Sequence, residues 1–123
     1  MTVAAIAVAG ALGALARYAL GGWVADRAHS VFPWGTLAVN VSGSLVLGFL
    51  FVLLTERFLP HPTLRIALTV GFLGAYTTFS TFSLETLRLI EDGAVGLATA
   101  NVLASVAAGL LAVYLGIVVG RAL

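Results

Sequence analysis

The sequence contains no cysteine and no lysine, and only 9% of its residues are charged. Without cysteine, the chain has neither a disulfide framework nor a thiolate metal site. A soluble domain carries about 25% charged residues, so this chain has too few charges to cover a surface in contact with water. The formal net charge of +1 also argues against a nucleic-acid partner. We therefore expect the lipid bilayer to surround most of the molecule.

Long apolar runs account for most of the sequence, of which 61% is hydrophobic. A helix needs about 20 mostly apolar residues to span a bilayer. We predict four spanning helices, over about residues 3–24, 36–54, 64–89 and 94–119. The first has no positively charged segment before it and is long enough to span, so we interpret it as a helix rather than a cleaved signal. The fold class expected is an all-α membrane protein with one transmembrane domain over residues 1–123.

Arginine is divided evenly between the two sides of this predicted domain. The side of the N-terminus carries Arg57, Arg65 and Arg121. The opposite side carries Arg17, Arg27 and Arg88. Membrane orientation follows an asymmetry of positive charge between the two sides, and this sequence has none. We therefore expect insertion in both orientations, although six arginines are a small sample. Two oppositely inserted copies can pair about a two-fold axis in the membrane plane, as inverted repeats do within one chain.

Glycine is frequent, with 14 residues, and several glycines lie four positions from another small residue. Examples are Gly10 with Ala14, Ser44 with Gly48, and Gly116 with Gly120. This spacing lets helix backbones approach closely in a membrane. The contacts can form within one chain or between subunits. Because four helices enclose little interior, we expect two subunits to build a polar pathway.

Polar residues recur every fourth position on two of the predicted helices. The second helix carries Thr36, Asn40, Ser44 and Gly48, and the fourth carries Asn101, Ser105 and Gly109. Each set lies along one helix face. Polar groups in hydrocarbon need hydrogen-bond partners, and packing between helices is their commoner role. We interpret Asn40 as functional, and leave both roles open for Asn101 and Ser105.

The third predicted helix contains a polar segment, Gly71 to Phe82, near the middle of the bilayer. Two glycines, three threonines and one serine lie within it, and these residues are poor helix formers. We predict an interruption near residues 74–78, and the alternative is a continuous helix with hydroxyls bonded to their own backbone. Carbonyls freed by an interruption can bind a cation at the midplane.

Two phenylalanines lie in this segment, just after the predicted interruption. Phe79 and Phe82 are three residues apart and share a helix face, where the positive ring edges could attract an anion; simple packing is the common alternative. Glu85 lies one turn further along, either at the rim of an aqueous vestibule or at the interface. No carboxylate lies in the middle of any span, which argues against a proton-coupled antiporter.

Three segments together resemble the Fluc (CrcB) fluoride channels. They are GALGALARY (10–18), GTLAVNVSG (35–43) and GFLGAYTTFSTFSLE (71–85). The resemblance covers essentially the whole chain, and the order and spacing of the segments agree. It implies a fluoride channel, not an enzyme, in the bacterial inner membrane. The protein would be an antiparallel, dual-topology homodimer in which fluoride leaves the cytoplasm passively.

The resemblance also implies roles for particular residues of this chain. A structural sodium ion at the dimer interface would be held by the backbone carbonyls of Gly74 and Thr77. Arg17 and Glu85 would lie at a vestibule. The fluoride pore would be lined by Asn40, Phe79, Phe82, Thr36, Thr81 and Ser105.

This sequence departs from the family's pattern at two places. Ala75-Tyr76 stands where a glycine and an aliphatic residue are expected, and Asn101 stands where tyrosine is common. The second departure changes a residue of the fourth helix that is expected among the pore contacts. The main rival is a small dual-topology multidrug or cation transporter, which needs a membrane carboxylate that the first helix lacks. A purely structural membrane subunit would need neither the polar faces nor the interruption.

Overall fold

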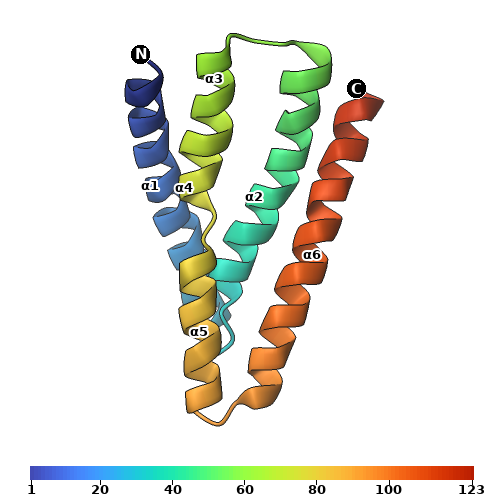
Figure 1. The fold of residues 1–123 in the computed structure, drawn as a ribbon. Coiled ribbons are helices and arrows are strands. Elements are labelled where there is room, and N and C mark those ends of the chain that lie inside the picture. Colours follow the sequence, from blue (N-terminus) through green and yellow to red (C-terminus); the bar gives the residue numbers. More distant parts are fainter.

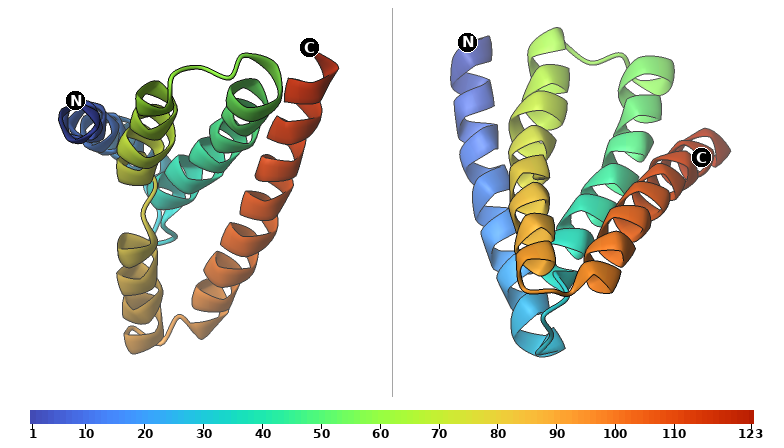
Figure 2. Two further views of the ribbon diagram at one scale, coloured as in Figure 1. Left: turned by 45° about the horizontal axis from the view of Figure 1, so that its top comes forward. Right: turned by 60° about the horizontal axis from the view of Figure 1, so that its bottom comes forward.

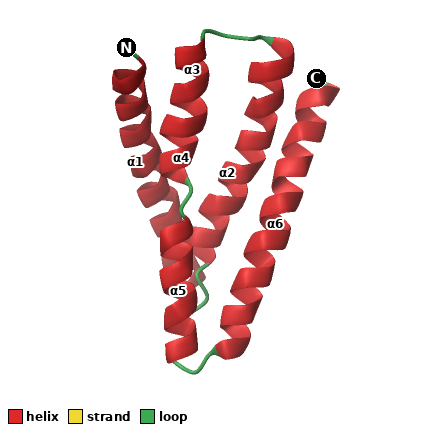
Figure 3. Ribbon diagram, viewed as in Figure 1, coloured by secondary structure: helices red, strands yellow, loops and turns green.

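The computed structural model describes residues 1–123, and the chain is entirely helical (Figures 1 and 3). Four helical spans are long and apolar enough to cross a membrane, which confirms this part of the predicted fold class. The first is α1 (Thr2–Ala28), and the second is α2 (Trp34–Val52) continued by a π-helical turn, η1 (Leu53–Arg57). The third contains α3 (Pro62–Ile66), the π-helical η2 (Ala67–Leu73), α4 (Gly74–Tyr76) and α5 (Phe79–Glu91), and the fourth is α6 (Val95–Ala122).

The spans run alternately up and down, so the N-terminus, the C-terminus and the loop after η1 lie at one end of the molecule (Figures 1 and 2). The residues at the helix ends determine where the connecting loops begin and end. His29 ends α1 in the left-handed conformation, with φ 46°. Pro62 begins α3 behind His61, whose ring accepts a hydrogen bond from the Thr63 amide, and proline suits this first position. The histidines therefore act as helix caps in the loops.

Glycines bring the helices into backbone contact. α6 packs most extensively on α2, where Gly116 lies against the backbone of Leu45 and Phe49 and Gly48 lies against the Val113 carbonyl. In the same way, Gly13 of α1 lies against the Phe72 carbonyl of η2. A side chain at any of these positions would hold the helices apart. Part of the glycine content thus serves packing within one chain.

The third span is interrupted in its middle, as the sequence analysis predicted. Thr77 and Thr78 are both extended, with ψ 157° and 116°, and the ribbon loses its helical shape there (Figure 1). The helix restarts because the Thr78 hydroxyl accepts a hydrogen bond from the Thr81 amide, the usual role of an N-cap threonine. Gly74, within the predicted interruption, remains helical.

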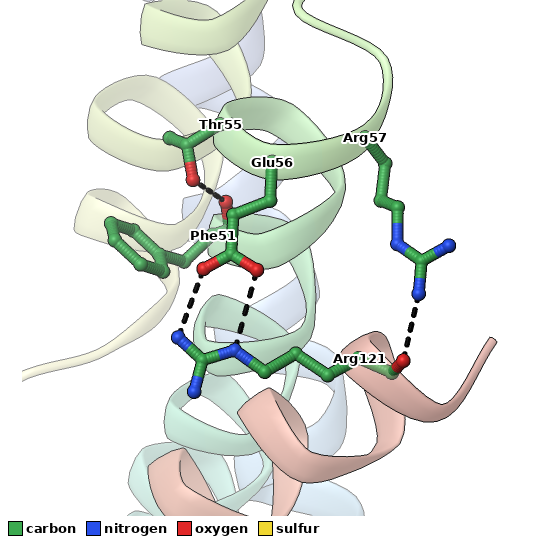
Figure 4. A network of polar contacts seen from close by, with 5 residues as sticks. All are labelled: Phe51, Thr55, Glu56, Arg57 and Arg121. Atoms are coloured by element: carbon green, nitrogen blue, oxygen red, sulfur yellow. Dashed lines mark hydrogen bonds and ion pairs between the residues drawn. The ribbon is translucent and has the colours of Figure 1, made fainter.

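A polar network joins the ends of the second and fourth spans (Figure 4). Arg121 donates hydrogen bonds to both carboxylate oxygens of Glu56, at 3.3 and 2.9 Å, and Arg57 donates to the Arg121 carbonyl at 2.7 Å. These side chains are exposed, so the network adds little stability and mainly orients the two helix ends.

The interior is small, and most large apolar side chains face outward. Its core is Val39, Leu73 and Tyr76, packed where α2 meets the third span. Leu110 and Leu103 of α6, at 70% and 64% exposure, are typical of the outer surface. Such a surface suits hydrocarbon rather than water, and the core supports the interruption from one side only.

Candidate functional site

All ten residues to which the family resemblance gives a role line one of two grooves on this surface. The first, of about 350 Å³, is named here the Phe79 groove, and the second, of about 600 Å³, the Arg17 groove. The Phe79 groove contains six of them, Asn40, Gly74, Thr77, Phe79, Phe82 and Ser105. The Arg17 groove contains the other four, Arg17, Thr36, Thr81 and Glu85. Thr36 and Thr81, expected with the pore residues, therefore lie in the same groove as Arg17 and Glu85.

Asn40 and Thr78 form the junction between the two grooves. The Asn40 side chain donates to the Thr78 carbonyl at 3.0 Å and accepts from the Thr78 amide at 2.7 Å. Thr78 is 8% exposed and lines both grooves. Asn40 thus satisfies the extended backbone at the interruption, a packing role that the sequence analysis had considered the alternative. One of its two amide hydrogens remains free of Thr78.

The polar ends of the Arg17 groove are tied by one short hydrogen bond. The Thr36 hydroxyl donates to a Glu85 carboxylate oxygen at 2.5 Å, joining α2 to α5. The hydrogen of Thr36 is therefore committed to Glu85. Arg17 lies in the same groove but forms no ion pair, since Arg121 and Glu56 make the only one in the molecule. The groove thus holds one guanidinium, Arg17, and one carboxylate, Glu85, and their formal charges balance although the two groups do not pair.

The two phenylalanines begin α5 directly after the interruption. Their ring centroids are 5.6 Å apart and the ring planes are tilted by 47°. Phe82 is half-buried, whereas Phe79 is 79% exposed. The interruption brings both rings to the wall of the Phe79 groove, so the predicted shared face is present.

The carbonyls of Gly74 and Thr77 lose the partners that a continuous helix would give them. In such a helix the amides of Thr78 and Thr81 would donate to them. Instead, the Thr78 amide donates to Asn40, and the Thr81 amide donates to the Thr78 hydroxyl. Both residues line the Phe79 groove. Free carbonyl oxygens are the type of ligand that hard cations prefer.

On α6 the structure separates the roles of Asn101 and Ser105. Asn101 is 1% exposed and donates to the Thr86 hydroxyl at 2.9 Å, which ties α6 to α5. Ser105 lines the Phe79 groove. Asn101 therefore contacts a second helix of the same chain and does not itself line the groove.

The importance of Thr78 and Tyr76 was not evident from the sequence. Thr78 has the N-cap signature of a threonine before a restarting helix, which could have identified it. The Tyr76 hydroxyl lies 2.8 Å from the Ser42 hydroxyl, and its ring packs beside Gly43, where a Cβ would come within 3.0 Å of it. No sequence signal predicts this contact, because it depends on how α2 and α4 cross.

Uncharged hydrogen-bond donors and aromatic rings make up the chemistry of the Phe79 groove. No charged side chain lines this groove. Covalent catalysis would need a nucleophile beside a general base, and the groove has no charged side chain to act as that base. The residues present are suited to binding a small ion weakly as it passes.

Comparison with known proteins agrees with this chemistry. The model of the family described as "CrcB-like protein, Camphor Resistance (CrcB)" matches residues 4–117. A protein of Geotalea uraniireducens named "Fluoride-specific ion channel FluC" is 52% identical, covering 99% of this chain and 98% of its own length. Proteins with the same name from Magnetococcus marinus and Geobacter sulfurreducens are each 51% identical, covering 98% and 99% of this chain and 98% of their own lengths. The chain therefore belongs to the Fluc (CrcB) family of fluoride channels, multi-pass proteins of bacterial membranes.

Proposed function

We propose that this protein is a passive, fluoride-selective channel that exports fluoride from the cytoplasm down its electrochemical gradient. The observation that carries the proposal is the Phe79 groove, which combines amide and hydroxyl groups with two phenyl rings and has no charged side chain. Neutral donors can replace water around a small anion without holding it so tightly that it cannot leave. The free amide hydrogen of Asn40 is one such donor.

The phenylalanine rings supply a second attraction for an anion. The edge of a phenyl ring is electrically positive and its face is negative. Phe79 and Phe82 are tilted relative to each other rather than stacked, so edges as well as faces are presented along the groove. An anion can therefore contact the positive edges of these rings. This supports an anion as the transported ion, and the names of the relatives support fluoride.

Export needs no energy coupling in this scheme. Hydrofluoric acid is a weak acid whose neutral form crosses membranes, and it dissociates in the less acidic cytoplasm. The membrane potential, negative inside, then favours the exit of the anion by about 2.3 kcal/mol per charge for each 100 mV. A channel that excludes chloride would lower cytoplasmic fluoride without dissipating other anion gradients.

A second copy in the opposite orientation would close the groove. The Phe79 groove is open at the surface, where Gly74 is exposed, and polar residues such as Thr77 and Ser105 line it; polar groups at this depth are unfavourable against lipid. The even division of arginines removes the usual preference for one orientation. Both observations support an antiparallel, dual-topology homodimer with a pore on each side of its two-fold axis.

The carbonyls of Gly74 and Thr77 fit a structural sodium ion at the interface. Their amide partners are bonded elsewhere, and both residues line the open groove. One copy supplies only two such oxygens, so equivalent carbonyls of the second copy would complete the site. When bound, the ion would supply positive charge that holds the two interruptions together.

Fluoride efflux from liposomes tests the proposal. Vesicles that contain the purified protein and are loaded with fluoride should release it to an electrode when a potassium ionophore balances the charge. The same vesicles loaded with chloride should retain it, and vesicles prepared without sodium should release fluoride more slowly. Fluoride release no faster than from empty vesicles would overturn the proposal, and equal release without sodium would remove only the sodium site.

A further inference from the structure

One hydroxyl in the Phe79 groove is bonded differently from six other hydroxyls of the chain. Six threonines and serines donate to the backbone carbonyl four residues earlier, at 2.5–2.9 Å, namely Thr55, Thr69, Thr77, Ser83, Thr86 and Thr99. Ser105 instead donates to the side-chain oxygen of Asn101, at 3.4 Å. This bond is longer than a typical O–H···O hydrogen bond. The proton of Ser105 is therefore held loosely.

The direction of this bond follows from the residues behind it. The Phe82 carbonyl can only accept, so the Thr86 hydroxyl donates its single hydrogen to it, at 2.7 Å. Thr86 must then accept from the amide nitrogen of Asn101. The Asn101 oxygen is consequently turned toward Ser105 and can only accept from it. We name this chain of hydrogen bonds, from Phe82 through Thr86 and Asn101 to Ser105, the Asn101 relay.

The relay connects the two walls of the groove from behind. Asn101 is 1% exposed and lines neither groove. Ser105 and Phe82, at the two ends of the relay, both line the Phe79 groove. Asn101 thus acts on the groove through its neighbours rather than by touching an ion itself.

We propose that Asn101 is a positioning residue that keeps the Ser105 proton available to an anion in the Phe79 groove. The inference rests on the proposed function and names a residue of its mechanism. An anion accepts hydrogen bonds roughly twice as strong as those between neutral groups, so the Ser105 hydroxyl readily turns from the long bond to Asn101 and donates to the anion instead. Without the Asn101 side chain, Ser105 would donate to the backbone carbonyl of residue 101, as the other hydroxyls do at their positions.

A double-mutant cycle on fluoride efflux tests this role. Asn101→Leu removes the amide but keeps the branch at Cγ, and Ser105→Ala removes the hydroxyl. Each single change should slow efflux roughly three- to ten-fold, the effect of about one hydrogen bond. The double variant should be no slower than either single one, because Asn101 acts through Ser105. The inference would be overturned if Asn101→Leu released fluoride at the wild-type rate. It would also be overturned if the rate losses of the two single variants multiplied in the double variant.

Two further variants keep the result interpretable. Thr99→Val removes an exposed hydroxyl of the same helix that lies outside the relay and should leave efflux unchanged. If Asn101→Leu does not yield a folded protein, Thr86→Val releases the Asn101 amide without changing either Asn101 or Ser105. Thr86→Val should slow fluoride efflux when Ser105 is present, but should cause no further slowing in the Ser105→Ala variant. Equal slowing in the two cases would contradict the relay. Wild-type vesicles that release no fluoride would instead refute the proposed function itself.

Discussion

At the scale of single residues, Asn40 has the largest structural consequence. It supplies both hydrogen bonds for the Thr78 backbone, which is extended and 8% exposed. In Asn40→Leu the amide and carbonyl of Thr78 would lose these partners at a depth without water. Each unpaired buried group costs about 1–3 kcal/mol, so we expect the free energy of unfolding to fall by about 2–4 kcal/mol.

Denaturation of the purified variant in detergent measures this effect. Ser83→Ala is a suitable control, because Ser83 is exposed and its hydroxyl bonds only to the Phe79 carbonyl. It should lower the stability by no more than about 1 kcal/mol. Equal stability of Asn40→Leu and the wild type would mean that the interruption does not depend on this side chain.

Residue spacing predicted part of this arrangement. Phe79 and Phe82 could be placed on one face because three residues separate them within a helix. Asn40 could be recognised as unusual because it lies deep in an apolar run. Its partner could not be predicted, because the contact joins residues 38 positions apart and depends on how the second and third spans pack. The relay through Asn101 was hidden for the same reason.

At the scale of the elements, the close approach of α2 and α6 depends on glycine. A Cβ on Gly116 would lie 2.8 Å from the Phe49 amide nitrogen and would also meet the Leu45 carbonyl. Backbone atoms cannot move aside as a flexible side chain can, so Gly116→Ala should push the helices apart. Overpacking of this kind typically costs about 1–3 kcal/mol, and we expect a lower melting temperature.

Gly96 of the same helix provides the matched control. A Cβ added there would meet nothing within 4 Å, so Gly96→Ala should melt at or above the wild-type temperature, since alanine favours the helix. Thermal melting of both variants in the same detergent decides the question. Similar melting temperatures for the two would show that α2 and α6 do not pack as described.

The sequence predicted these elements better than their junctions. Apolar runs of about 20 residues identified the four spans because the bilayer thickness sets their length. The interruption was placed at residues 74–78, whereas only Thr77 and Thr78 leave the helix. Glycine tolerates a helix at Gly74, and the break falls where Asn40 and the Thr78 cap offer alternative bonds. The residues at which a helix breaks are decided by hydrogen-bond partners that the local sequence does not contain.

At the scale of the whole molecule, the division of arginines leads to a topology prediction. The chain has no cysteine, so Asp92→Cys gives a single reactive thiol in the loop between α5 and α6. If the protein inserts in both orientations, about half of the copies should react with a membrane-impermeant maleimide in intact cells. The remainder should react only after the cells are permeabilised. Complete labelling, or none, before permeabilisation would mean one orientation.

The central claim is that fluoride passes between neutral donors and the rings of the Phe79 groove. Fluoride efflux from liposomes with Phe79→Ile tests it most directly, because isoleucine keeps an apolar side chain but has no positive ring edge. The matched control is Phe51→Ile, which changes a phenylalanine that is 49% exposed and lies outside both grooves. We expect Phe79→Ile to abolish efflux and Phe51→Ile to preserve it. Undiminished efflux in Phe79→Ile would contradict the account.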